Sequence, residues 1–193
     1  YTTSGKAGFI TALYIVLVPL MAFIVFKRKI TKLQALSVLV AIVAMYFISI
    51  TEELSISQGD FFVLICAFFF TSQILCIDYY SEGVDGIRFS MFMFATCTII
   101  NAVLMFVFES PNFNLLLKGW APILYLGVAS SGIAYTLQII GQQYCSPLLA
   151  CMLMSLESVF ALVSGWIILG QVMSGREIFG CCLLMGAIVM AQL

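Results

Sequence analysis

Long runs of apolar residues without a charged side chain recur along the chain. A helix needs roughly 20 apolar residues to cross a hydrocarbon core of about 30 Å, and these runs have about that length. They are continuous, whereas the strands of a membrane barrel alternate apolar and polar residues. The pattern therefore predicts an all-α integral membrane protein, a polytopic helical bundle. Its seven expected spans are Ala7–Phe26, Leu33–Thr51, Phe61–Ile77, Phe89–Phe108, Trp120–Gly141, Leu148–Leu169 and Ile178–Leu193.

The connectors between these runs are short, and none has room for a separate soluble domain. Consecutive helices must then run in opposite directions, so successive loops alternate between the two sides of the membrane. The loop KRKITK (residues 27–32) holds four of the eight basic residues, which accumulate in cytoplasmic loops. We expect this loop and Leu193 to face the cytoplasm, and Glu52–Asp60 to face the opposite side.

The composition indicates that lipid surrounds most of the chain. Hydrophobic residues make up 63% of it and charged residues 9%, against about a quarter charged in soluble domains. A soluble globule of this composition would expose apolar patches well beyond a few hundred Å². With a net charge of -1, the chain also has no basic surface for nucleic acid. We therefore expect a lipid bilayer and no nucleic acid among its partners.

Seven cysteines and no histidine leave little for metal or redox chemistry. The cysteines show no CxxC spacing, and all but Cys145 lie in apolar runs, where a free thiol behaves as a small hydrophobe. We therefore expect no metal site, no cofactor and no catalytic residue. An intramembrane hydrolase, the enzyme alternative, lacks the histidine base of a serine mechanism and the second deep carboxyl group of an aspartyl mechanism.

The start and the end of the chain share a weak but ordered similarity. Tyr1–Ala7 lies over Tyr144–Ala150 at a shift of 143 residues, and Leu17–Ala22 lies over Leu156–Ala161 at a shift of 139. The difference between the shifts predicts one additional helical turn in the earlier copy.

This similarity suggests a division into two repeats. We interpret residues 1–51 as the last two helices of one repeat and residues 59–193 as a complete repeat of five helices. An odd number of helices inverts the second copy in the membrane, which gives the inverted-repeat architecture of many secondary transporters.

Two stretches resemble a known family. The earlier stretch YTTSGKAGFITALYIVLVPL and the later stretch PLLACMLMSLESVFALVSGWIILGQVMSGREIFGCCLLMGAIVM are similar to matching helices of EamA-type permeases in the drug/metabolite transporter superfamily. The resemblance covers essentially the whole chain. It implies a ten-helix transporter fold, of which this chain holds helices four to ten and lacks the first three. The chain departs from the family pattern at Ser158, where proline is frequent, and at Gln171, where glutamate is common.

Glu157 is the charged residue that lies well inside an expected span. It stands nine residues beyond Leu148, so at 1.5 Å per residue it lies about 14 Å deep, near the bilayer midplane. A carboxyl group away from water favours its protonated form, and intramembrane carboxyl groups serve in proton relays. We expect Glu157 to face the bundle interior and to couple transport to protons. The alternative is a neutral carboxyl group that only bonds a neighbouring helix.

A polar stripe interrupts the expected span Trp120–Gly141. Ser131, Tyr135, Gln138 and Gln142 follow one another at spacings of four, three and four, which places them on one face of an α-helix. The stripe predicts a water-filled substrate path, with hydrogen bonding between helices as the alternative. Further polar candidates inside the spans are Thr11, Tyr14, Gln73 and Asn101.

These features favour a transmembrane transporter that exports small metabolites or drug-like compounds by alternating access. No expected span holds a lysine or arginine that would neutralise a phosphate, so a neutral, zwitterionic or cationic substrate is favoured. Helices missing from this chain are the other source of such a cation. A seven-helix receptor or another non-transport membrane protein is the alternative, suggested only by the number of helices. We expect a multi-pass protein of the bacterial cytoplasmic membrane, and a homodimer is left open.

Overall fold

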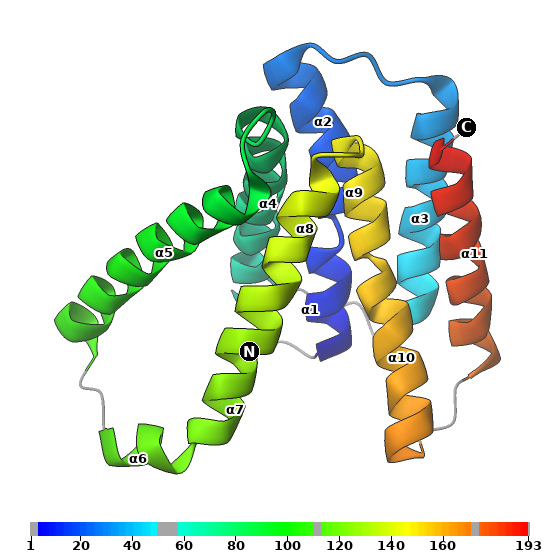
Figure 1. Ribbon diagram of the computed structural model, residues 1–193. Coiled ribbons are helices and arrows are strands. Elements are labelled where there is room, and N and C mark those ends of the chain that lie inside the picture. The colour runs from blue at the N-terminus through cyan, green and yellow to red at the C-terminus, as the bar shows by residue number, and fades with distance from the viewer. Residues whose placement is uncertain (1–3, 50–57, 110–112, 171–173, 193) are drawn as a thin grey trace. The chain divides into compact units, whose positions relative to one another are not determined.

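The computed structural model describes residues 4–49, 58–109, 113–170 and 174–192 (Figure 1). Every regular element in these ranges is a helix, which confirms the predicted all-α class. The elements in chain order are α1 (Ser4–Thr11), α2 (Tyr14–Phe26), α3 (Lys32–Ser49), α4 (Gln58–Tyr80), α5 (Gly86–Phe108), α6 (Phe113–Lys118), α7 (Trp120–Tyr125), the π-helix η1 (Leu126–Tyr135), α8 (Thr136–Gln142), α9 (Pro147–Met154), α10 (Leu156–Leu169) and α11 (Gly175–Gln192).

Six helical stretches of the described chain are long and apolar enough to cross a membrane. They correspond to six of the seven expected spans, and three of them combine consecutive elements: α1 with α2, α7 with η1 and α8, and α9 with α10. The remaining expected span is α3, a shorter apolar helix, and its expected end at Thr51 lies outside the described residues. Most of the connector 52–60 and the end at Leu193 lie outside them as well.

The chain divides into two compact units. The first contains residues 1–76 and 146–193, and the second contains residues 77–145. The division falls within α4, between Cys76 and Ile77. The first unit therefore combines the two ends of the chain, which are distant in sequence.

The first unit contains the helix pair α3 and α11, which lie side by side and run in opposite directions (Figure 1). Gly180 on α11 permits this close approach, because a Cβ there would lie 2.8 Å from Cγ1 of Ile48 and 3.0 Å from the carbonyl oxygen of Ala44. Small residues have the same role at other interfaces between membrane helices. The buried core around this pair also takes side chains from other helices, among them Ile15, Val18, Ile74 and Cys151.

One broken helix of the first unit consists of α1 and α2. α1 ends at Thr11 and α2 begins at Tyr14, and between them the Leu13 amide bonds the Ile10 carbonyl oxygen at 3.1 Å, three residues back instead of four. Pro19 is the strongest helix breaker in this stretch, yet it lies inside α2. The position of the break is therefore not marked by a proline.

The other broken helix consists of α9 and α10, which meet at Ser155. The Ser155 amide is shared between the carbonyl oxygens of Cys151 and Met152, at 3.2 Å each. The Ser155 hydroxyl group donates to the Cys151 carbonyl oxygen at 2.9 Å, and a serine that bonds its own helix in this way often bends it. Neither proline nor glycine stands at this break.

Helices near the start of the chain match helices near its end when 143 is added to their residue numbers. Adding 143 to the bounds of α1 gives those of α9, and adding 143 to the bounds of α3 gives those of α11. Lys27 after α2 and Gly170 after α10 also lie 143 positions apart. Both have a left-handed backbone conformation, with φ of 53° and 64°. Figure 1 shows that α1 and α2 run opposite to α9 and α10, and α1 packs on α3 as α9 packs on α11. These bounds favour a single shift of 143 over the second shift of 139 that residue identities suggest.

The second unit is organised by the turn between α4 and α5. Asp85 caps α5, and its carboxylate accepts from two backbone amides of the first turn at 2.9 and 3.0 Å. The side-chain amide of Gln143 donates to the carbonyl oxygens of Ser81 and Val84, at 2.8 Å each. The residue after α8 therefore holds the turn in place. Apolar side chains farther along α5 are exposed, a surface that suits lipid, including Phe92, Ile99 and Phe106.

Candidate functional site

A hydrogen bond joins the two broken helices of the first unit. The phenol oxygen of Tyr14, at the start of α2, lies 3.1 Å from Oγ of Ser155, at the break between α9 and α10. Both residues are buried, with 6% and 2% of their surfaces exposed. Irregular backbone at membrane depth is tolerated where protein buries it or where it lines a cavity, and transporters build binding sites from discontinuous helices. The bond therefore pairs two buried polar groups at the two helix breaks.

The direction of the bond follows from the second bond of Ser155. A serine hydroxyl group has one hydrogen to donate, and that of Ser155 goes to the Cys151 carbonyl oxygen. Tyr14 is therefore the donor and Ser155 the acceptor. The ring of Tyr14 packs against Phe70 of α4, with ring centroids 5.3 Å apart, so its orientation is held by packing as well.

Glu157 stands in the first turn of α10, two residues beyond Ser155. We call Tyr14, Ser155 and Glu157 the helix-break cluster. The side chain of Glu157 is exposed in the described structure. Its expected orientation toward the interior of the full bundle stays a prediction.

Tyr14 and Glu157 are equivalent positions under the shift of 143 that relates the helix bounds. Each stands in the first turn after a helix break. The two helices run in opposite directions (Figure 1). One helix carries a phenol group at this position and the other a carboxyl group.

In the second unit, Gln138 and Gln142 lie one turn apart on α8. Gln142 is buried, with 5% of its surface exposed, yet neither its amide nitrogen nor its amide oxygen has a hydrogen-bond partner among the described residues. The amide nitrogen of Gln138 lacks one in the same part of the chain. An unpaired buried amide costs about 1–3 kcal/mol, so such groups are expected where water or a ligand completes the bonding.

The other two residues of the predicted polar stripe lie in η1. The hydrogen bonds of a π-helix reach five residues back, so the α-helical spacing assumed for the stripe applies only from Gln138 to Gln142. Ser131 is exposed. Tyr135 is half-buried, and its ring centroid lies 6.4 Å from that of Phe94.

The remaining polar candidates of the spans are separate from these groups. Asn101 is exposed on α5 and donates to the Cys97 carbonyl oxygen of its own helix at 2.8 Å. Thr11 likewise donates to the Ala7 carbonyl oxygen at 2.8 Å, and Gln73 is half-buried on α4. Within the described ranges, no group of three His, Cys, Asp or Glu side chains is placed to hold a metal ion.

Sequence reasoning missed Ser155 and Gln143. A single serine in an apolar run is common and carries no charge, so nothing distinguishes Ser155 from other small residues. A shift of 143 applied throughout would have paired Glu157 with Tyr14 and drawn attention to the residues beside them. Gln143 lies between the expected spans Trp120–Gly141 and Leu148–Leu169, and only its two bonds in the structure identify its role.

Comparisons with known proteins give one family. Residues 57–192 match the model of the EamA-like transporter family. The whole chain is 30% identical, over 193 residues, to an uncharacterized transporter of Archaeoglobus fulgidus and covers 62% of that protein. It is also 24% identical over 175 residues to Protein LicB of Haemophilus influenzae, which aligns 89% of this chain with 60% of that protein. The chain thus spans about three fifths of the length of these relatives.

A solved crystal structure has a similar fold. The alignment has a TM-score of 0.79 and covers 98% of this chain and 67% of the other chain. The two are 16% identical, and a likeness at this identity concerns the fold alone.

Proposed function

The chain belongs to the EamA-like transporter family, and from that premise we propose that the whole protein carries small molecules across a membrane by alternating access. The family match confirms the resemblance expected from the sequence. Because the described part of the chain has six helices able to span a bilayer, the chain is an integral, multi-pass membrane protein. We place it in the bacterial cytoplasmic membrane, with export as its direction.

The hydrogen bond between Tyr14 and Ser155 is the observation that carries the proposal. In alternating access, two halves of a transporter rock around a site near the bilayer midplane. The bond joins two oppositely directed helices at their breaks, where such a site is expected (Figure 1). One hydrogen bond contributes roughly 1 kcal/mol, enough to favour one arrangement and little enough to be exchanged for a bond to substrate.

Glu157 is the proposed proton carrier of the cluster. A carboxylate only accepts hydrogen bonds, whereas a protonated carboxyl group also donates one. Proton binding would therefore change the hydrogen bonds open to Glu157, and with them the relative stability of two arrangements of α2 and α10. A ligand shifts such an equilibrium only through different affinities for the two states, and a proton bound at Glu157 meets that condition.

The substrate class follows from the charge of the cluster. It contains one acidic side chain and no basic one, so a neutral, zwitterionic or cationic molecule suits it better than an anion. In the second unit, Gln138 and Gln142 supply amides that can both donate and accept, and we propose that they line the substrate path there with Ser131 and Tyr135. Asn101 is a weaker member of this set, because its amide bonds its own helix.

The proposed architecture is a pair of inverted repeats within a ten-helix fold. Residues 1–51 would belong to the first repeat and residues 59–193 to the second. The common shift of 143 and the opposite helix directions support this division (Figure 1). The family match, which starts at residue 57, supports the boundary.

Reconstitution tests the proposed activity. Proteoliposomes that contain the whole protein would be given a pH gradient and offered ethidium, an amino-acid mixture and a neutral hexose, one probe for each favoured class. We expect accumulation of at least one class and its loss when the gradient is collapsed. Uptake equal to that of protein-free liposomes for every probe would contradict the proposal.

A further inference from the structure

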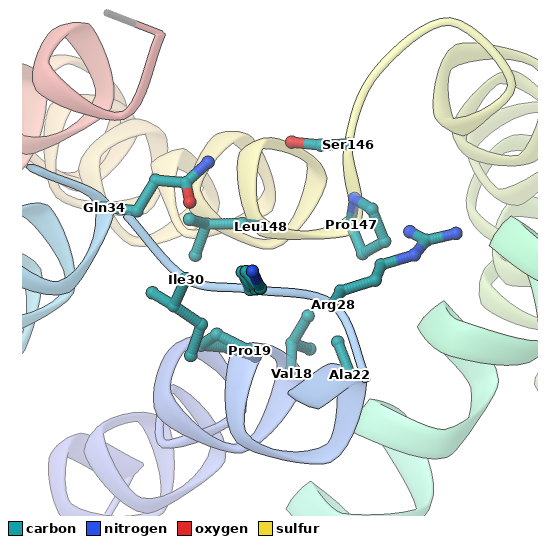
Figure 2. Close-up of a pocket in the computed structure, with 10 residues that line it drawn as sticks. Val18, Pro19, Ala22, Arg28, Ile30, Gln34, Ser146, Pro147 and Leu148 are labelled. Carbon is teal, nitrogen blue, oxygen red and sulfur yellow. The ribbon is translucent and has the colours of Figure 1, made fainter. Parts of the chain in front are cut away.

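A cavity of about 100 Å³ lies in the first unit between the connector after α2 and the start of α9 (Figure 2). Its apolar part comes from Val18, Pro19 and Ala22 of α2 and from Leu148 of α9, all of which are buried. Figure 2 shows Leu148 on one side of the connector and the three α2 residues on the other. By volume the cavity accommodates several water molecules or one group of phosphate size.

The rim of the cavity carries positive charge. Arg28 and Lys29 line it from the connector, and both are exposed. The guanidinium carbon of Arg28 lies 5.7 Å from the centroid of the Phe26 ring, and Figure 2 shows its side chain reaching past Pro147. Long exposed side chains of this kind cover apolar surface with their stems, and here both line the cavity.

Two neutral polar groups complete the rim. Gln34 accepts from the Thr31 amide at 3.0 Å through its side-chain oxygen, so its side-chain nitrogen can donate to a ligand. Ser146 caps α9 and accepts from the Leu149 amide at 3.3 Å, and its hydroxyl group can still donate. Donors and cations therefore surround an apolar floor.

We propose that this cavity binds the phosphate group of an anionic membrane lipid. Fixed cations and hydrogen-bond donors are the groups that recognise phosphate, and basic pockets between membrane helices bind anionic headgroups. The connector joins the ends of two apolar helices, which places it at the membrane–water interface. A soluble phosphate ester shares the charge chemistry, but the apolar floor of Val18, Pro19 and Ala22 suits the glycerol and acyl part of a lipid.

The connector does not need these charges to join its helices. Under the shift of 143, Arg28 corresponds to Gln171 and Lys29 to Val172, so the equivalent connector has neither cation. Basic residues in a loop also orient a chain in the membrane. Lys27 and Lys32 provide that charge equally well, and neither lines the cavity. Replacement of Lys27 and Lys32 is therefore the control that distinguishes a binding site from a general effect of loop charge.

A lipid bound here would contact the end of α2, the connector and the start of α9. α2 and α9 pack on each other, so the bound phosphate would stabilise their contact. The lipid composition of the membrane would then shift the balance between arrangements of these helices. This inference requires no assumption about the transported substrate.

Thermal unfolding of the purified whole protein in a neutral detergent tests the site. The probes are phosphatidylglycerol, phosphatidylcholine with the same acyl chains, and inorganic phosphate. We expect phosphatidylglycerol to raise the Tm more than the other two. The double variant Arg28→Gln with Lys29→Gln should lose more than half of that rise, whereas Lys27→Gln with Lys32→Gln, which removes the same charge, should keep it.

Native mass spectrometry of the same samples counts the phosphatidylglycerol molecules retained per protein and does not depend on protein stability. It should show one retained lipid fewer in the Arg28 and Lys29 variant only. Equal losses in both double variants would reduce the effect to diffuse attraction and overturn the site. A rise with inorganic phosphate equal to that with phosphatidylglycerol would overturn the lipid as its ligand in favour of a soluble phosphate.

Discussion

The hydroxyl group of Tyr14 donates a hydrogen bond of 3.1 Å to Ser155, 141 positions away in the chain. The bond connects the breaks of two oppositely directed helices, and Glu157, the equivalent of Tyr14 in the other helix, stands two residues beyond Ser155. The proposal of transport therefore depends on a small set of identified atoms. The predictions below separate the contribution of this cluster to stability from its contribution to function.

Tyr14→Phe removes the hydroxyl group and keeps the ring against Phe70. We expect the free energy of unfolding to fall by about 1 kcal/mol, because one buried hydrogen bond is lost while Ser155 keeps its bond to Cys151. Thermal unfolding in detergent measures the change. Tyr144→Phe is the control, since Tyr144 is 84% exposed, and equal effects of the two variants would contradict the assigned bond.

Gly180→Ala should destabilise the contact between α3 and α11. Its Cβ would lie 2.8 Å from Cγ1 of Ile48 and 3.0 Å from a backbone oxygen, and overpacking of this kind costs about 1–3 kcal/mol. Gly186→Ala on the same helix adds the same methyl group where nothing lies within 4 Å, and it should leave stability unchanged or slightly higher. The same Tm for both variants would show that the helices are not packed as described.

Lys27→Gly should stabilise the protein. The backbone of Lys27 is in the left-handed region, with φ of 53°. This conformation costs an L-residue about 1 kcal/mol and glycine nothing. Gly170 occupies the equivalent position after α10. We expect a higher free energy of unfolding by up to about 1 kcal/mol. Lys32→Gly, at the first residue of α3, should lower it. A loss of stability in Lys27→Gly would contradict the assigned backbone conformation.

Gln142→Leu should separate stability from function. The amide of Gln142 is buried and unpaired among the described residues, so an apolar side chain of similar size is expected to leave the Tm unchanged or to raise it. Transport in proteoliposomes should fall, because the polar group that completes its bonding with water or substrate is gone. A lower Tm together with normal transport would favour a structural role in helix bonding.

The helices themselves could be predicted well from apolar runs, and their ends less well. α11 begins at Gly175, three residues before the expected Ile178, because a polar first turn can belong to a membrane helix. Ser174 and Glu177 form a capping box there: the Ser174 amide donates to the Glu177 carboxylate at 2.7 Å, and the Glu177 amide donates to Ser174 at 3.3 Å. A search for charge-free runs excludes such a turn.

The helix breaks could not be predicted, because local sequence signals do not mark them. Pro19 lies inside α2, while the break before Tyr14 and the break at Ser155 contain neither proline nor glycine. Tyr14 and Glu157 are nevertheless predictable as candidates, since polar groups are conspicuous in apolar runs. Their relationship required the correct repeat shift, and residue identities in apolar helices carry too little information to choose between shifts of 139 and 143.

Glu157→Gln tests the central claim that the helix-break cluster couples transport to protons. Proteoliposomes with the whole protein would be loaded with a pH-sensitive dye and given a pH gradient, and uptake of the transported probe and proton flux would be recorded together. Glu82→Gln is the matched control, because it makes the same change at an exposed residue of a connector. We predict that Glu157→Gln folds and exchanges the probe across the membrane but neither concentrates it nor moves protons with it. Wild-type accumulation and proton flux in Glu157→Gln would contradict the account, and loss of folded protein in this variant alone would assign Glu157 to packing instead.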